Sequence, residues 1–352
     1  MNDVAICIGN IVIYWSSIVI FLGVAVCFTY AYALYTANGG KKAAMWLMLP
    51  VAVGLGVFFS RWIHWYCHSE QYTGMISALT DYSSGGYCLP GAFLGVVLAV
   101  LLVKALLVCD SAGKMFDAIV PGAALGLAVI RLSALFNSSC RGKVIISTPM
   151  LQRLPLASPV TTANGAVEYR LATFFIEFMV LLVLFLVIQR LFNKRRSWPT
   201  KGNAPVHGNV ALLFLAYYGA TQVILDSTRY DSSFLPINGF VSIVQIVGAV
   251  FLVGIMVYYT VWSAKTNGFL KKQVVLWVLF LAAVGGTGYL EYLVQRYGNM
   301  YLPVYAGMTC TLMIMCIVIK QMYRTICVSK EEKKALDNAE QMNAGLKEPA
   351  TV

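Results

Sequence analysis

The sequence predicts an all-α integral membrane protein, a helical bundle of about nine transmembrane helices, and three observations carry that prediction. Of its 352 residues, 59% are hydrophobic and only 12% are charged, whereas a soluble domain has about 45–50% apolar and about 25% charged residues. The mean hydropathy is +0.73, and the apolar residues gather in runs of about 20, the length that crosses a ~30 Å hydrocarbon core. Basic residues fall in short clusters between these runs, which argues against a nucleic-acid-binding surface despite the net charge of +11. An ordinary soluble enzyme, a disordered chain and a secreted disulfide scaffold are excluded.

Each expected helix corresponds to one apolar run long enough for a span. The runs cover residues 8–34, 45–65, 86–108, 116–137, 170–192, 208–226, 240–263, 273–295 and 301–323. Beyond them the chain ends in a polar segment of mixed charge, which we expect to be solvated.

The distribution of Lys and Arg assigns the two sides of the membrane, since cytoplasmic loops retain positive charge. The loop at 66–85 has no basic residue, and the loops at 227–239 and 296–300 have one each. The long loop at 138–168 is basic and departs from this pattern. The loops on the opposite side of the membrane, together with the C-terminal tail, carry many basic residues. These are Lys41, Lys42, Lys114, Arg190, Lys194, Arg195, Arg196, Lys201, Lys265, Lys271, Lys272, Lys330, Lys333 and Lys334. We therefore expect the N-terminus outside, the C-terminus in the cytoplasm and the loop at 138–168 on the external face.

Four ionisable residues fall inside or at the ends of spans, where they are costly to bury and become functional candidates. They are Arg61, Arg131, Glu177 and Asp226. Arg131 and Asn137 are six residues apart, so they can converge on one ligand only if the helix breaks near Ser133–Asn137. The alternative is that Arg131 reaches the outer interface or pairs with Glu177 or Asp226.

Six segments, in order, resemble the bacterial prolipoprotein diacylglyceryl transferases. They are IGNIVIYWSSIVIFLG, GLGVFFSRWIHW, GGYCLPGAFLG, the segment with Asp117, Pro121, Gly126 and Arg131, YRLATFFIE, and QVILDSTRYDSSFL followed by NGFVSIVQIVG. The resemblance covers roughly residues 5–260. It implies a seven-span transferase-like core over 1–263, with the external head region at 138–168. Two additional helices over 264–323 and a cytoplasmic tail over 324–352 would follow.

The family moves a diacylglyceryl group from phosphatidylglycerol to the thiol of a lipobox cysteine, and the matched motifs imply the site. The catalytic residues implied here are Arg131, Asn137, Asp226 and Arg229, and the substrate-binding residues are Arg61, Gly86, Gly91, Gly142 and Glu177. Several family positions have changed. The histidine of the third-span motif is Pro90, and the tyrosine, glutamate and arginine of other motifs are Ser16, Ser139 and Gln222.

Transfer from a phosphodiester lipid needs positive charge at the phosphate and a deprotonated thiol. Guanidinium groups bind phosphate through paired hydrogen bonds, so Arg131 and Arg229, with Asn137 as a neutral donor, form the expected clamp. The thiol needs a base, for which histidine is the usual residue, and Pro90 has no proton to exchange.

A replacement base is conceivable at the outer end of the second span. His64 and His68 are four residues apart, hence on one helix face, and Cys67 lies between them. As a metal site this trio lacks a remote fourth ligand, and we expect no metal and no cofactor. The simplest interpretation is a pair of interfacial histidines in an aromatic belt.

We therefore expect a membrane-embedded transferase of the bacterial plasma membrane with phosphatidylglycerol, or another anionic phospholipid, and prolipoprotein signal peptides as partners. Because the family histidine is Pro90, we expect bound lipid and altered or weak transfer. Two alternatives stay open: a pseudoenzyme that binds an anionic phospholipid or a partner, and a lipid-handling transporter, although the chain shows no inverted repeat.

Overall fold

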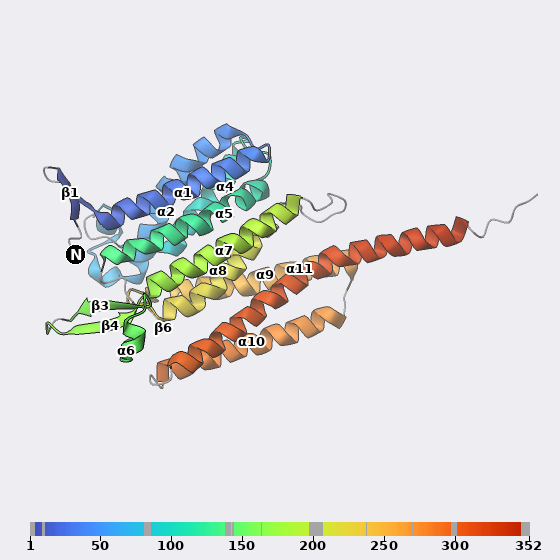
Figure 1. Ribbon diagram of the computed structural model, residues 1–352. Helices are drawn as coiled ribbons and strands as arrows, with labels where there is room; N and C mark the ends of the chain where they lie inside the picture. Colours follow the sequence, from blue (N-terminus) through green and yellow to red (C-terminus); the bar gives the residue numbers. More distant parts are fainter. Residues whose placement is uncertain are drawn as a thin grey trace, which may run out of the picture. The chain divides into compact units, whose positions relative to one another are not determined.

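The computed structural model describes residues 4–8, 11–80, 86–137, 142, 144–162, 164–196, 207–236, 238–268, 271–296 and 301–345. Over these residues, eight helices are long and apolar enough to cross a membrane, which confirms the predicted all-α membrane protein (Figure 1). They are α1 (Trp15–Ala37), α2 (Lys42–Cys67), α5 (Ala112–Arg131), α7 (Thr173–Arg196), α8 (Asn209–Ser227), α9 (Ile243–Asn267), α10 (Lys271–Arg296) and α11 (Tyr301–Gly345). The remaining predicted run holds α4 (Leu89–Ala105), whose 17 residues lie at the short limit for a span, so its crossing stays a prediction.

The start of the first span differs from the prediction. The apolar run from residue 8 does not begin a helix; instead β1 (Val4–Ile8) pairs antiparallel with β2 (Ile11–Tyr14), and α1 begins at Trp15. These two segments are rich in Val and Ile, whose branched side chains favour strands. Hydropathy alone could not separate this hairpin from the helix that follows.

The chain divides into two compact units, one with Met1–Trp198 and His207–Ala249, the other with Pro199–Val206 and Val250–Val352. In the first unit, α1 packs along α5 and α2 packs along α4. Glycines allow the backbones of α2 and α4 to approach closely. A Cβ added at Gly95 would lie 2.4 Å from the backbone nitrogen of Gly56. Small residues at such contacts are typical of membrane helix pairs.

A buried carboxylate inside α5 caps the start of α8. Asp117 is fully buried, and its two carboxylate oxygens accept hydrogen bonds from the backbone nitrogens of Gly208 at 2.7 Å and Ala211 at 2.9 Å. The first N–H groups of a helix have no partner within the helix and are satisfied in this way. Asp117 therefore joins α5 to α8 at the end of α8 opposite Arg229.

Short elements at the other end of these helices bring distant segments together. They are η1 (Ser69–Gln71), α3 (Met75–Thr80), η2 (Leu132–Phe136), α6 (Pro149–Gln152), the hairpin of β3 (Ala157–Thr161) and β4 (Val167–Leu171), and the pair β5 (Phe234–Leu235) and β6 (Asn238–Ser242). Gly142 donates its N–H to the carbonyl of Leu171 at 3.0 Å, and the hydroxyls of Thr173 and Thr228 lie 3.0 Å apart. These contacts fix the start of α7 against the segment that follows α8.

The second unit is held by hydrogen bonds between α10, α11 and the later part of α9. Gln273 donates to the hydroxyl of Ser263 at 2.8 Å, which lies 3.0 Å from the hydroxyl of Thr325. The indole of Trp277 donates to Thr260 at 3.0 Å. In the region predicted as a tail, α11 continues to Gly345.

Candidate functional site

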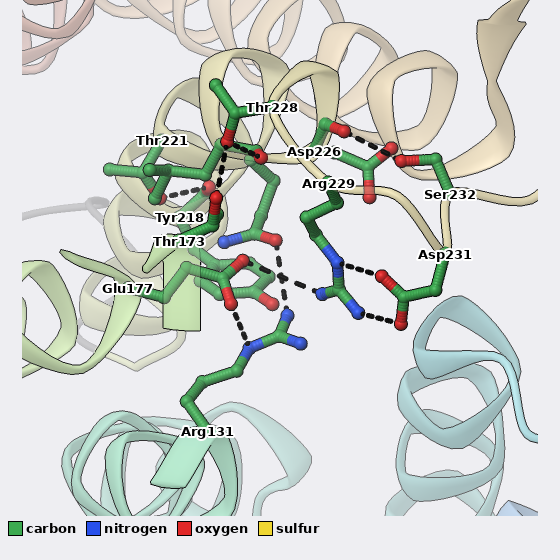
Figure 2. A network of polar contacts seen from close by, with 12 residues as sticks. Arg131, Thr173, Glu177, Tyr218, Thr221, Asp226, Thr228, Arg229, Asp231 and Ser232 are labelled. Atoms are coloured by element: carbon green, nitrogen blue, oxygen red, sulfur yellow. Dashed lines mark hydrogen bonds and ion pairs between the residues drawn. The ribbon is translucent and has the colours of Figure 1, made fainter. Parts of the chain in front are cut away.

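The candidate site centres on one buried carboxylate that lies between two arginines (Figure 2). Glu177, in the first turns of α7, is 2% exposed. Its Oε2 lies 2.9 Å from Nε of Arg131, and its Oε1 lies 3.6 Å from Nη1 of Arg229. Of the alternatives considered for Arg131, the structure shows the pair with Glu177, and Arg229 shares the same partner.

The arginines reach Glu177 because two helices end beside it. α5 ends at Arg131, and the chain tightens into η2 before it becomes extended at Asn137. The helix thus breaks where a shared ligand for Arg131 and Asn137 would require it, and that shared ligand stays a prediction. α8 ends at Ser227, and the backbone nitrogen of Arg229 donates to the carbonyl of Asp226 at 3.1 Å.

Gly142 lies directly against this second helix end. It forms an isolated antiparallel bridge with Arg229, and a Cβ added to it would lie 2.4 Å from the carbonyl oxygen of Leu171 and 2.7 Å from the hydroxyl of Thr173. Only glycine fits here, so the structure explains this family glycine by backbone packing beside Arg229.

Asp231 completes the coordination of Arg229. Its carboxylate oxygens accept from Nε at 2.9 Å and from Nη2 at 2.7 Å, a bidentate pair. Burial by itself would raise the pKa of Asp231, but the hydrogen bonds and the charge of Arg229 outweigh it and hold the pKa below its usual value. Burial likewise opposes the charge of Arg229, and Glu177 and Asp231 outweigh it and raise the pKa of the guanidinium. Sequence reasoning missed Asp231, whose only signal was its position two residues after an arginine.

Two further buried polar residues of α8 line the cluster. Gln222, which stands where the family motif has an arginine, is 1% exposed and accepts from Nη2 of Arg131 at 3.4 Å. Asp226 is 3% exposed, and its backbone carbonyl accepts from the hydroxyl of Ser232 at 2.7 Å. Among the residues that the structure describes, Nε2 of Gln222 and Oδ2 of Asp226 have no hydrogen-bond partner. Buried groups of this kind mark a place where a ligand group can bind.

Arg61 and Asn137 have surroundings of their own. Arg61 is 2% exposed and donates to the carbonyls of Ala78 at 2.9 Å and Gly86 at 3.4 Å, so it fastens the segment that leads into α4. Asn137 is exposed at the end of η2. Its role in binding stays a prediction.

Two of the predicted substrate-binding glycines lie where backbones or rings approach closely. A Cβ added at Gly91 would lie 2.3 Å from the carbonyl oxygen of Phe59, so this glycine lets α4 pack on α2. Gly86 has φ +79°, in the left-handed region, and a Cβ there would lie 2.5 Å from the ring of His64. The changed family position Ser139 lies outside the described residues.

His64 of α2 and His68, which caps the end of this helix, form a small cluster beside Gly86. The rings of His64 and His68 stack with centroids 4.3 Å apart, which confirms that they share a face. The hydroxyl of Tyr72 lies 3.4 Å from Nδ1 of His64. Over the described part of the chain, no group of three or more His, Cys, Asp or Glu residues is arranged to hold a metal ion.

Comparison with known proteins identifies the family. The model of the prolipoprotein diacylglyceryl transferase family matches residues 3–262, well over half of the chain. The protein belongs to this family. Three similar proteins carry the name phosphatidylglycerol–prolipoprotein diacylglyceryl transferase, and they come from Dehalococcoides mccartyi, Oceanobacillus iheyensis and Clostridium kluyveri.

The transferases are distant relatives that align over most of their length. The Dehalococcoides protein is 24% identical over 243 residues, which cover 66% of this chain and 84% of the relative. The Oceanobacillus protein is 25% identical over 244 residues, covering 67% and 79%. The Clostridium protein is 21% identical over 259 residues, covering 73% and 96%.

Family membership and the apolar helices together make this a prolipoprotein diacylglyceryl transferase-like enzyme of bacterial membranes that spans the bilayer several times. The resemblance drawn from the sequence is confirmed. The comparisons give no support to the pseudoenzyme and transporter alternatives.

Proposed function

We propose that this protein transfers a diacylglyceryl group from phosphatidylglycerol, or another anionic phospholipid, to the cysteine thiol of prolipoprotein signal peptides. The observation that carries the proposal is the convergence of two arginines from separate chain segments on Glu177, at the ends of α5, α7 and α8. Two guanidinium groups held at fixed positions in a poorly hydrated site suit a lipid phosphodiester.

The lipid phosphate would meet the arginines in different ways. Nε and Nη2 of Arg131 face Glu177 and Gln222, while its Nη1 projects away from them (Figure 2). The fork of Arg229 is occupied by the carboxylate of Asp231, which is 29% exposed. Asp231 therefore holds the position that a phosphate would take on Arg229, and lipid binding at this arginine would displace it.

The transfer step can be written from these groups. The thiolate sulfur attacks the diacylglyceryl carbon bonded to the phosphate oxygen, the sulfur–carbon bond forms and the carbon–oxygen bond breaks. The electron pair leaves on the phosphate oxygen of the headgroup, whose charge Arg131 and Arg229 stabilise. The thiol proton must pass to a base, and Pro90, in the first turn of α4, cannot take it.

The other residues fall into supporting roles under this proposal. Asn137 donates a neutral hydrogen bond to the lipid, and Asp226 orients Arg229. Glu177 and Gly142 hold the arginines in place. Arg61, Gly86 and Gly91 shape the segment leading into α4, along which we place the path of the substrate.

We also propose the organisation expected from the sequence: a transferase core over 1–263, two additional helices over 264–323 and a cytoplasmic tail over 324–352, with the N-terminus outside. Loop charges support this orientation. A reporter fused after residue 200 should report the cytoplasm, and one placed within 145–165 should report the exterior. The reverse result would refute the orientation.

Lipid retention and turnover test the function. The full chain, extracted in mild detergent, should carry anionic phospholipid in native mass spectrometry. Arg131→Ala and Arg229→Ala should lose it, while Arg153→Ala, an exposed arginine after α6, should keep it. Retention by both site variants would refute the clamp. Transfer is measured with phosphatidylglycerol and a lipobox peptide, and absence of any transfer would refute the assigned reaction.

A further inference from the structure

The imidazole of His64 faces the segment at residues 86–88. This segment runs from the histidine cluster (His64 and His68) toward the arginine cluster (Arg131, Glu177, Arg229 and Asp231). A Cβ at Gly86 would lie 2.5 Å from Cε1, 2.8 Å from Nδ1 and 2.9 Å from Nε2 of His64. The face of the ring, over Cε1 and its two flanking nitrogens, is therefore what meets the backbone of Gly86. A left-handed glycine is the residue that leaves room for it.

This segment is fastened to α2 at both of its ends. Nη1 of Arg61 donates to the carbonyl of Gly86 at 3.4 Å. The backbone nitrogen of Cys88 donates to the carbonyl of Ser60 at 3.3 Å, and the hydroxyl of Ser60 donates to the carbonyl of Cys88 at 2.8 Å. Ser60 and His64 are one turn apart on α2, so the same helix face holds the segment and presents the imidazole to it.

The far end of the segment lies within electrostatic range of Arg229 and Asp226. The charges of Asp226 and Arg229 act on the thiol of Cys88, which is 4% exposed. Because this side chain is buried, Cys88 is not accessible to compete as a nucleophile. Three residues of backbone, Gly86 to Cys88, thus run from the ring of His64 to a thiol within electrostatic range of Arg229.

The hydrogen bonds of the cluster leave a ring nitrogen of His64 for proton transfer. Nδ1 of His64 lies 3.4 Å from the hydroxyl of Tyr72. When Nδ1–H donates to this oxygen, the lone pair is on Nε2. The ring of His68 stacks on the other side, and its Nδ1–H donates to the carbonyl of His64 at 3.1 Å, because a carbonyl can only accept. The partly exposed ring of His64 can return its proton to water.

We propose that His64 is the general base of the transfer and takes over the task for which Pro90 is unsuited. This inference rests on the proposed function. The proton of the acceptor thiol moves to Nε2 of His64, the thiolate attacks the diacylglyceryl carbon, and the headgroup phosphate leaves with the bonding electrons. The proton then passes from the imidazolium to the released phosphate or to water, which restores the neutral ring.

The test compares glutamine variants of all three histidines in the chain, using phosphatidylglycerol vesicles and a lipobox peptide. His64→Gln should lower kcat by about 10²–10⁴-fold, the usual loss with a general base, and should keep its bound lipid. His207→Gln, near the opposite end of α8, should retain the wild-type rate. His68→Gln should lose less than about tenfold, since it removes a stacking neighbour and no proton acceptor.

Chemical rescue separates a base from a packing residue. Imidazole in the buffer should restore turnover to His64→Ala and leave the wild type unchanged. A His64→Gln variant within about tenfold of wild type would overturn the inference and leave the proposed function standing. A loss that imidazole does not rescue, accompanied by lost lipid, would overturn it in favour of a packing role. A wild-type chain with no turnover would overturn both proposals.

Discussion

Gly23 of α1 and Gly126 of α5 lie with their backbones in contact. A Cβ added to Gly126 would come within 2.5 Å of the carbonyl oxygen of Gly23, and one added to Gly23 within 2.7 Å of the carbonyl oxygen of Gly126. Neither oxygen can move away without shifting a helix. Gly126→Ala should therefore lower the free energy of unfolding by about 1–3 kcal/mol, the cost of overpacking a close contact. Thermal unfolding in detergent measures this loss.

Gly54→Ala is the matched control for that variant. Gly54 is also in a helix of the first unit, but its added methyl would meet nothing within 4 Å. This substitution should leave the unfolding temperature unchanged or raise it slightly, because alanine has a higher helix propensity than glycine. Equal effects of the two substitutions would contradict the close contact.

Loss of the shared carboxylate should destabilise the site strongly. Glu177→Gln keeps the volume of the side chain but leaves Arg131 and Arg229 without their common counter-charge. Removing one partner from a buried ion pair costs about 3–5 kcal/mol. Glu168→Gln is the control. The side chain of Glu168 is 36% exposed and that of its partner Arg170 is 23% exposed, and such exposed pairs contribute about 0–1 kcal/mol to stability. Chemical unfolding of both variants makes the comparison, and equal losses would refute the central role of Glu177.

Neutralising Asp231 should strengthen lipid binding, if lipid phosphate and this carboxylate compete for the fork of Arg229. Asp231→Asn should raise the affinity for phosphatidylglycerol about 5- to 10-fold, equivalent to about 1–1.4 kcal/mol. Asp110→Asn removes a carboxylate from an exposed pair with Lys41 and should leave affinity unchanged. Titration with the lipid in detergent supplies the constants. Weaker binding by Asp231→Asn would show that Asp231 positions Arg229 for the lipid.

The pH dependence of the Arg229–Asp231 pair follows from the sign of the pKa shift. The folded pKa of Asp231 lies below its usual 3.8, so the unfolded chain takes up the proton first as the pH falls. The pair's contribution is fully present above pH 3.8 and is lost as the pH drops through the lower folded value. The difference in unfolding temperature between wild type and Asp231→Asn should therefore be constant from pH 7 to about pH 5 and shrink below about pH 3.8. A difference that already shrinks between pH 7 and pH 5 would contradict the pairing.

Much of the helical framework could be predicted from the sequence because the thickness of a bilayer sets the length of an apolar run. The same signal could not locate the first helix boundary, since Val4–Ile8 and Ile11–Tyr14 are as apolar as the helix that follows. Strand pairing there depends on contacts between the two segments, which hydropathy does not contain.

Of the contacts in the candidate site, the sequence indicated one as an alternative and could not indicate the others. Glu177, one of the two partners considered for Arg131, is the residue that the structure pairs with it, because a buried charge needs a counter-charge nearby. That Arg229 shares this partner depends on how α5, α7 and α8 end beside one another. Two further contacts could not be predicted. The pair of Asp231 with Arg229 depends on the geometry of the loop after α8, and the cap that Asp117 provides depends on α8, a helix distant in sequence.

The bond between Ser263 and Gln273 bears on how this protein could change during evolution. The match to the transferase family ends at residue 262, one residue before a hydroxyl whose partners lie on α10 and α11. A shortened gene product ending after α9 would leave the hydroxyl of Ser263 without Gln273 and Thr325, at a cost in stability. Loss of the two C-terminal helices therefore carries a cost at Ser263 that an apolar replacement at this position of α9 would remove.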